Sequence, residues 1–138
     1  MTIEEAEGGY RQAMRAHGLA PIFLAAPTSP DDRLRRIAAA SEGFVYAISR
    51  TGITGTQRSL TADAHTLADR LRAFTRLPIA LGFGISNPEQ VATVAEFADA
   101  AVIGSAIVSL IEQTSPQDAP STVGRFIAGL RPSLTLAG

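Results

Sequence analysis

Four short runs of consecutive apolar residues recur along the chain, and a stretch with helical character follows each of them. The runs cover residues 21–26, 44–49, 77–81 and 100–103. Apolar runs of this length, bounded by glycine, proline and polar residues, predict buried strands. Strands that are apolar throughout and alternate with helices are typical of a parallel sheet covered by helices, so the pattern predicts an α/β fold.

The helical stretches carry recognisable start signals. Thr2 and Glu5 have the spacing of a capping box, and Ser29, Thr61 and Asn87 are predicted N-caps, two of them followed directly by proline. Helices are therefore expected over residues 3–16, 30–42, 61–74, 105–113 and 121–130, and another is expected from Pro88 onwards. Residues 50–60 form a polar, glycine-containing loop, and residues 114–120 a polar linker.

The predicted elements amount to four strand–helix units preceded by one helix. The 138 residues suggest one domain, spanning residues 1–138. Two architectures fit this order equally well: an open four-stranded α/β sheet, or half of an eight-stranded (β/α) barrel. A complete barrel needs about 200–250 residues, so the chain alone is too short to form one.

Two glycine-bearing turns stand where predicted strands give way to predicted helices. Gly82-Phe83-Gly84-Ile85-Ser86 follows the third strand, and Ile103-Gly104-Ser105-Ala106-Ile107 follows the fourth. Neighbouring turns at helix N-termini gather backbone N–H groups into an anion site, and in parallel barrels the loops after the last two strands commonly hold a substrate phosphate. The plainer alternative is that the glycines serve only turn geometry and Ser105 is an ordinary N-cap.

Composition and charge remove several classes of function. All 12 basic residues are arginine, so a lysine Schiff base, a pyridoxal-phosphate lysine and a P-loop are excluded on this chain. The chain has no cysteine, so it has no thiol nucleophile, disulfide or cysteine-ligated metal. The net charge of −1 does not indicate nucleic-acid binding, and no apolar stretch is long enough to predict a membrane span. We expect no metal site, no nucleophilic triad, no cofactor on this chain and a cytoplasmic location.

From about residue 18 to residue 130, the chain resembles the C-terminal half of the tryptophan synthase alpha subunit. The Ser-Arg-Thr-Gly-Ile-Thr-Gly run at 49–55 distinguishes this family from other phosphate-binding barrels. The matching segments are residues 21–29, 44–55, 77–86 and 103–108. The resemblance implies a (β/α) barrel whose fifth to eighth strands are the four predicted here. It also implies a lyase of tryptophan biosynthesis, which cleaves indole-3-glycerol phosphate to indole and glyceraldehyde 3-phosphate.

The resemblance also implies roles for individual residues. Gly55, Gly84, Gly104 and Ser105 would supply donors around the substrate phosphate. Residues 50–60 would form a lid over the substrate.

Four side chains complete the implied site. Phe83 would pack near the indole ring, and Tyr46 would position the reacting part of the substrate. By the same resemblance, Arg50 and Thr54 would belong to the lid, and Thr54 would contact an aspartate in the missing half. Thr54 and Arg50 could also be ordinary polar loop residues, and Tyr46 a core tyrosine.

The family's catalytic glutamate and aspartate lie in the first half of the barrel, which this chain lacks. The resemblance therefore implies phosphate binding and substrate positioning here, an isolated chain without activity, and a pyridoxal-phosphate beta subunit as partner of the complete protein. The alternative function is a non-catalytic half-barrel that binds phosphate or self-assembles. Its exposed sheet edges, near residues 22–25 and 100–103, would drive self-association. A barrel acting on another sugar phosphate is disfavoured by residues 50–55.

Overall fold

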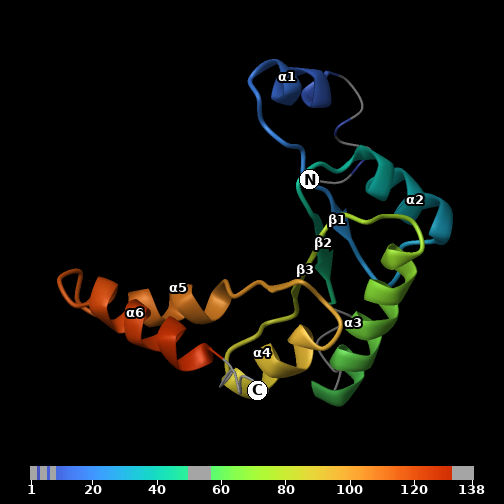
Figure 1. Cartoon of the computed structure of the whole chain (residues 1–138). Helices are drawn as coiled ribbons and strands as arrows, with labels where there is room; N and C mark the ends of the chain where they lie inside the picture. Colours follow the sequence, from blue (N-terminus) through green and yellow to red (C-terminus); the bar gives the residue numbers. More distant parts are fainter. Residues whose placement is uncertain (1–2, 4–5, 7–8, 50–56, 132–138) are drawn as a thin grey trace, which may run out of the picture.

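The computed structural model describes residues 3, 6, 9–49 and 57–131, which form one parallel sheet with helices around it (Figure 1). The strands are β1 (Leu24–Ala25), β2 (Val45–Ile48), β3 (Ile79–Gly82) and β4 (Ala100–Ala101). The helices are α1 (Tyr10–Ala16), α2 (Asp31–Ala40), α3 (Gln57–Arg72), α4 (Pro88–Ala95), α5 (Ser105–Glu112) and α6 (Ala119–Leu130).

The sheet has the strand order β1-β2-β3-β4, and all of its pairs are parallel. An open doubly wound sheet reverses its strand order at a switch point and carries helices on both faces. When the strands of a parallel sheet follow one another in chain order, every strand–helix–strand crossover has the same hand, so all connecting helices lie on one face of the sheet. The topology thus favours half of a barrel, one of the two architectures that the sequence left open.

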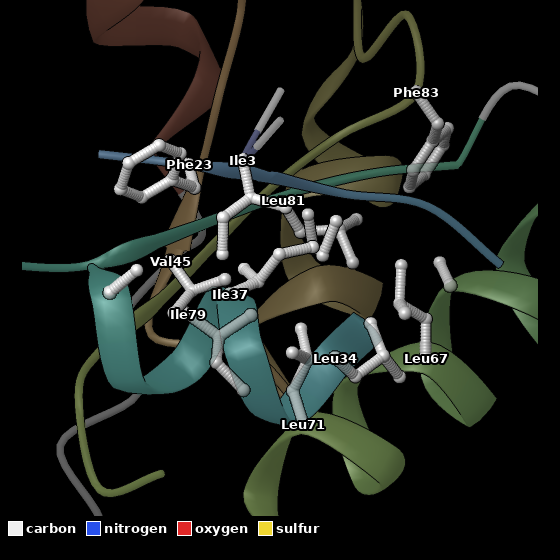
Figure 2. Packing of buried hydrophobic residues seen from close by; sticks show 14 of the residues in the cluster. Ile3, Phe23, Leu34, Ile37, Val45, Leu67, Leu71, Ile79, Leu81 and Phe83 are labelled. Atoms are coloured by element: carbon white, nitrogen blue, oxygen red, sulfur yellow. The ribbon is translucent and has the colours of Figure 1, made fainter. Parts of the chain in front are cut away.

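Alternate strand residues point to opposite faces of the sheet, and one set forms the core. From the strands, the core cluster takes Ala25, Val45, Ala47, Ile79 and Leu81. They pack against buried side chains of the covering helices. Figure 2 labels Leu34, Ile37, Leu67 and Leu71 among these, and Val94 belongs to the same cluster. Each fully buried leucine, isoleucine or valine contributes about 1.5–3 kcal/mol, so this face provides most of the stability.

The first predicted helix is shorter than expected. The prediction of residues 3–16 is wrong at its start, because α1 begins at Tyr10 behind Gly9, whose φ of 98° is incompatible with a helix interior. Thr2 and Glu5 lie outside the described residues.

Two of the three predicted N-caps are also wrong. Pro30, not Ser29, is the N-cap of α2, and the Ser29 hydroxyl instead accepts a hydrogen bond from the Ala26 N–H at 3.3 Å. Thr61 lies inside α3, which begins at Gln57. Asn87 is confirmed, since its side chain accepts from the Gln90 N–H at 2.9 Å.

A guanidinium on α3 joins that helix to the segment that follows β1. Arg70 donates to the carbonyl oxygens of Pro27 at 3.1 Å and Ser29 at 2.6 Å, and twice to the Asp31 carboxylate at 2.7 and 3.0 Å. A single side chain therefore satisfies two loop carbonyls and fixes the start of α2 against α3.

A second polar contact joins the start of β3 to the residue before β4. The Asp99 carboxylate accepts hydrogen bonds from the Ile79 N–H at 2.7 Å and from the Arg72 guanidinium. Arg72 also donates to the Leu77 carbonyl oxygen at 3.3 Å. The Ile79 N–H first, and Arg72 second, hold the pKa of Asp99 below its usual range.

This lowered pKa gives the fold an acid dependence. The stabilisation that the Asp99 carboxylate contributes is fully present above the unfolded-state pKa of about 4. It is lost as the pH falls towards the lower pKa that Asp99 has in the folded state. The Asp99 side chain is 44% exposed, so the loss should not exceed about 1 kcal/mol. We expect Asp99→Asn to lower the free energy of unfolding at pH 7. We also expect this free energy to fall less steeply between about pH 5 and pH 3 in the variant than in the wild type, as measured by urea unfolding.

Glu96→Gln, at an exposed carboxylate at the C-cap of α4, is the matched control and should retain the wild-type acid dependence. If the free energy of unfolding fell equally with pH in the wild type and in Asp99→Asn, this role for Asp99 would be contradicted.

Candidate functional site

A pocket of about 240 Å³ lies at the carboxyl ends of β2, β3 and β4. Strand β2 contributes Tyr46 and Ile48, and the end of β3 with the following turn contributes Gly82, Phe83 and Gly84. Val102 and the beginning of α5 complete the wall: Val102, Gly104 and Ser105. The two glycine-bearing turns, about 20 residues apart in sequence, thus share one pocket.

The glycines in this pocket serve different purposes. Gly84 has a φ of 87°, in the left-handed region that favours glycine. Gly104 is the N-cap of α5 with a φ of −116°, and a Cβ there would meet no atom within 4 Å. Gly104 therefore does not serve a positive φ, and it leaves open space beside the start of the helix.

The start of α5 borders this open space. Ser105 is the first residue of the helix and Gly104 its N-cap, so the alternative that Ser105 is the N-cap is wrong. The first amides of any helix have no acceptor within the helix, and the helix dipole places partial positive charge there. This corner of the pocket therefore suits an anion.

Tyr46 reaches across the end of the neighbouring strand. A Cβ on Gly82 would lie 3.1 Å from the Tyr46 hydroxyl oxygen, 3.4 Å from Tyr46 Cε2 and 3.4 Å from Val102 Cβ. These distances are tighter than most Cβ contacts, so a side chain at position 82 would require the phenol or its neighbours to shift by a few tenths of an ångström. The absence of a side chain at Gly82 therefore lets the Tyr46 phenol lie directly against the end of β3.

Phe83 contributes both to the pocket wall and to the hydrophobic core. Its side chain is only 6% exposed and belongs to the core cluster, where Figure 2 shows it apart from Ile37 and Val45. Phe83 thus gives the pocket a buried apolar lining, whereas Gly104 and Ser105 in the same lining are exposed.

The structure thus brings together five of the predicted site residues: Tyr46, Phe83, Gly84, Gly104 and Ser105. Arg50, Thr54 and Gly55 lie outside the described residues. The prediction missed Ile48 and Val102 as lining residues. Strand alternation could have found Ile48, because it follows Tyr46 by two positions and shares its face.

The lining residues within the described ranges provide binding groups but no carboxylate, imidazole or cation. The described residues also contain no cluster of three or more histidines and carboxylates that could hold a metal ion. None of the described helices is long and apolar enough to span a membrane. The pocket can bind and orient a ligand that has an anionic end and an apolar body.

Comparison with known proteins identifies the family. The family described as "Tryptophan synthase alpha chain" matches residues 3–131. The chain belongs to this family. The tryptophan synthase alpha chain of Solibacter usitatus is 52% identical over 114 residues, which are 83% of this chain and 42% of that relative. The alpha chain of Dehalococcoides mccartyi is 46% identical, covering 88% of this chain and 47% of the relative.

Solved structures give the same result for the fold. A mutant tryptophan synthase alpha-subunit from Pyrococcus furiosus superposes with a TM-score of 0.77 at 31% identity, covering 94% of this chain and 51% of that one. Tryptophan synthase from Mycobacterium tuberculosis superposes with a TM-score of 0.76 at 34% identity, and the match covers 95% of this chain and 49% of that one. The chain spans about half the length of these tryptophan synthase alpha chains, and it matches the C-terminal part of the barrel. The predicted half-barrel is confirmed.

The contact between Gly82 and Tyr46 predicts a specific coupling. Gly82→Ala places a methyl group 3.1 Å from the Tyr46 hydroxyl and should destabilise the fold by about 1–3 kcal/mol through overpacking. Tyr46→Phe removes the clashing oxygen, so the double variant should recover part of that loss. A double-mutant cycle by urea unfolding measures the coupling.

Gly104→Ala is the matched control, because its Cβ would meet nothing within 4 Å, and it should change stability by less than about 1 kcal/mol. A Gly82→Ala loss that Tyr46→Phe leaves unchanged would contradict the proposed contact.

Proposed function

We propose that this chain is the substrate-binding half of an indole-3-glycerol-phosphate lyase, the activity that releases indole and glyceraldehyde 3-phosphate in tryptophan biosynthesis. The observation that carries the proposal is the single pocket shared by Tyr46, Phe83, Gly84, Gly104 and Ser105 in a member of the tryptophan synthase alpha family. The pocket lies at the carboxyl ends of parallel strands, where barrel enzymes carry their active sites.

The phosphate would bind at the start of α5. Open space at Gly104 lets a phosphate oxygen approach the first amides of the helix, and the Ser105 hydroxyl can add a hydrogen bond. The left-handed turn at Gly84 brings a second stretch of backbone to the same pocket. We assign the same role to Gly55, which follows β2, as the third of the glycines in this cradle.

The indole ring would occupy the apolar side of the pocket. Phe83 supplies a fixed aromatic wall, and Ile48 and Val102 supply aliphatic contacts. Tyr46, held across Gly82, would position the glycerol carbons between ring and phosphate. Arg50 and Thr54 would belong to the segment that closes over the bound substrate.

The reaction is a retro-aldol cleavage that requires two proton transfers. The bond between the indole ring and the glycerol chain breaks, the ring carbon gains a proton, and a glycerol hydroxyl loses one as the aldehyde forms. Each transfer needs a positioned acid or base. The described lining residues offer no carboxylate, so both groups would come from a first half of the barrel, and this chain would contribute binding and orientation.

The complete barrel would be the unit that meets a beta subunit. A second solved structure from Pyrococcus furiosus to which this chain is similar is of the tryptophan synthase α2β2 complex. We propose the same type of partner for a barrel completed by a first half, rather than for this chain alone.

A charge change at the phosphate cradle tests the binding role. Ser105→Asp puts a carboxylate at the start of α5, where it suits the helix dipole but repels a phosphate dianion. We expect it to weaken binding of indole-propanol phosphate at least tenfold, about 1.4 kcal/mol, in isothermal titration calorimetry. Ser121→Asp, in the first turn of α6, is the matched control and should bind as the wild type does.

Equal affinities of Ser105→Asp and the wild type would contradict the phosphate site.

Complementation tests the enzymatic role. Mixing the chain with the first half of the Solibacter usitatus alpha chain should restore indole release, measured by absorbance, while each half alone remains inactive. A folded complex of the two halves that binds the analogue but releases no indole would contradict the lyase proposal. It would instead favour the alternative, a non-catalytic phosphate-binding module.

A further inference from the structure

The segment between β3 and α4 lines the pocket but has little regular hydrogen bonding. It runs from Phe83 to Asn87, and its residues Phe83 and Gly84 belong to the pocket wall. Within the described part of the chain, the N–H groups of Phe83, Gly84 and Ile85 have no acceptor. These amides do not hold the turn in shape, so its conformation depends on other contacts.

Some of these contacts are apolar. The side chains of Phe83 and Ile85 are 6% and 1% exposed and belong to the core cluster. Gly84 lies between them, exposed and without a side chain, at a φ of 87°. Apolar burial is non-directional, so it fixes where the chain runs but not how each peptide group is turned. Glycine is the residue that restricts this rotation least.

A side chain of α4 supplies a directional contact. The Gln90 Oε1 accepts a hydrogen bond from the Ser86 N–H at 2.7 Å, and the Ser86 hydroxyl oxygen lies 3.5 Å from the same atom. The Gln90 N–H in turn donates to the Asn87 side chain at 2.9 Å. Because a hydrogen bond depends on its angle, the first of these fixes the orientation of the peptide group between Ile85 and Ser86.

This pair of contacts departs from the usual capping box. In that motif, the side chain three residues after the N-cap bonds to the N–H of the N-cap residue itself. Here Asn87 is the N-cap, yet Gln90 reaches one residue further back, to Ser86. The Ser86 N–H is not one of the unpaired amides of the helix start. The contact therefore secures the turn, whereas the helix already has its cap in Asn87.

We propose that Gln90 is a positioning residue for the phosphate site: it holds the Gly84 turn in the conformation that receives the anion, without contacting the ligand. Gln90 is not part of the pocket lining and acts through Ser86. The inference rests on the proposed function, which assigns a phosphate to this pocket. A turn already held in its bound shape loses less conformational entropy on binding, so the Gln90 contact strengthens binding.

Gln90→Met tests this role, because methionine has a similar length but only a weak sulfur acceptor. Hydrogen exchange followed by NMR should show the Ser86 amide exchanging at least tenfold faster in the variant than in the wild type. Isothermal titration calorimetry should show the Kd for indole-propanol phosphate raised at least fivefold. The circular dichroism spectrum should stay unchanged, because the Asn87 cap and the buried Val94 still hold α4.

Two matched variants separate the turn from the helix. Gln90→Glu retains an oxygen acceptor at the same reach, so its Ser86 amide should exchange as in the wild type. Thr93→Val removes a different hydrogen bond of α4, from the Thr93 hydroxyl to the Glu89 carbonyl oxygen at 2.9 Å. This variant should change neither the exchange of Ser86 nor the Kd of the analogue.

The wild type alone provides a measurement that needs no variant. In the free protein, the Ser86 amide should be more protected from exchange than the Gly84 amide, which has no acceptor within the described residues. Addition of indole-propanol phosphate should then slow the exchange of Gly84. Equal protection of the two amides in the free protein would overturn the inference.

Two results with Gln90→Met would also overturn it. One is exchange of Ser86 at the wild-type rate. The other is faster exchange with an unchanged Kd, which would leave Gln90 a role in the turn but none in binding. Failure of the proposed function has a different signature: the wild type would bind no analogue, and the phosphate site would fail together with its positioning residue. Wild-type binding that Gln90→Met leaves unchanged removes the positioning role alone.

Discussion

The parallel register between β2 and β3 is the constraint on which the rest of the structure depends. It pairs Val45 with Ile79 and Ile48 with Gly82, so one face receives the core residues and the other receives Tyr46. Because side chains alternate along a strand, a shift of one residue would exchange the two faces. It would also move the phenol away from Gly82, against which it packs closely. Core and pocket are therefore fixed by the same set of pairs.

Stability and binding are divided between the two ends of this sheet. Asp99, Arg72 and the Ile79 N–H form their hydrogen bonds where β3 and β4 begin, while the pocket lies where these strands end. Barrels allow this division because their loops at the carboxyl end can carry function while the other end maintains the fold. The Asp99 contact can thus be altered to probe stability without touching Gly84 or Ser105.

The sequence predicted what depends on short-range patterns. The four strands, the Asn87 cap and five of the pocket-lining residues were found because apolar runs and strand-to-helix turns are local signals. The predicted caps at Ser29 and Thr61 failed because a hydroxyl near a helix start has several possible partners. Ser29 bonds to the preceding turn, and α3 extends one turn before Thr61. Periodicity also could not distinguish an open sheet from a half-barrel, since both bury the same apolar strands.

The contact of Tyr46 with Gly82 lies beyond any such pattern, because the two residues meet only through pairing of strands more than 30 residues apart in sequence. The glycine motif suggested backbone conformation or ligand approach, whereas the structure shows space for a neighbouring ring. The Tyr46 ring packs against the backbone of Gly82 and lines the pocket at the same time. A half-barrel can therefore carry an ordered binding surface even though it brings no proton-transfer group of its own among the described lining residues. Such a surface gains catalytic use only when another half places its acids and bases against it, so closure of the barrel is the step that would connect this fold to chemistry.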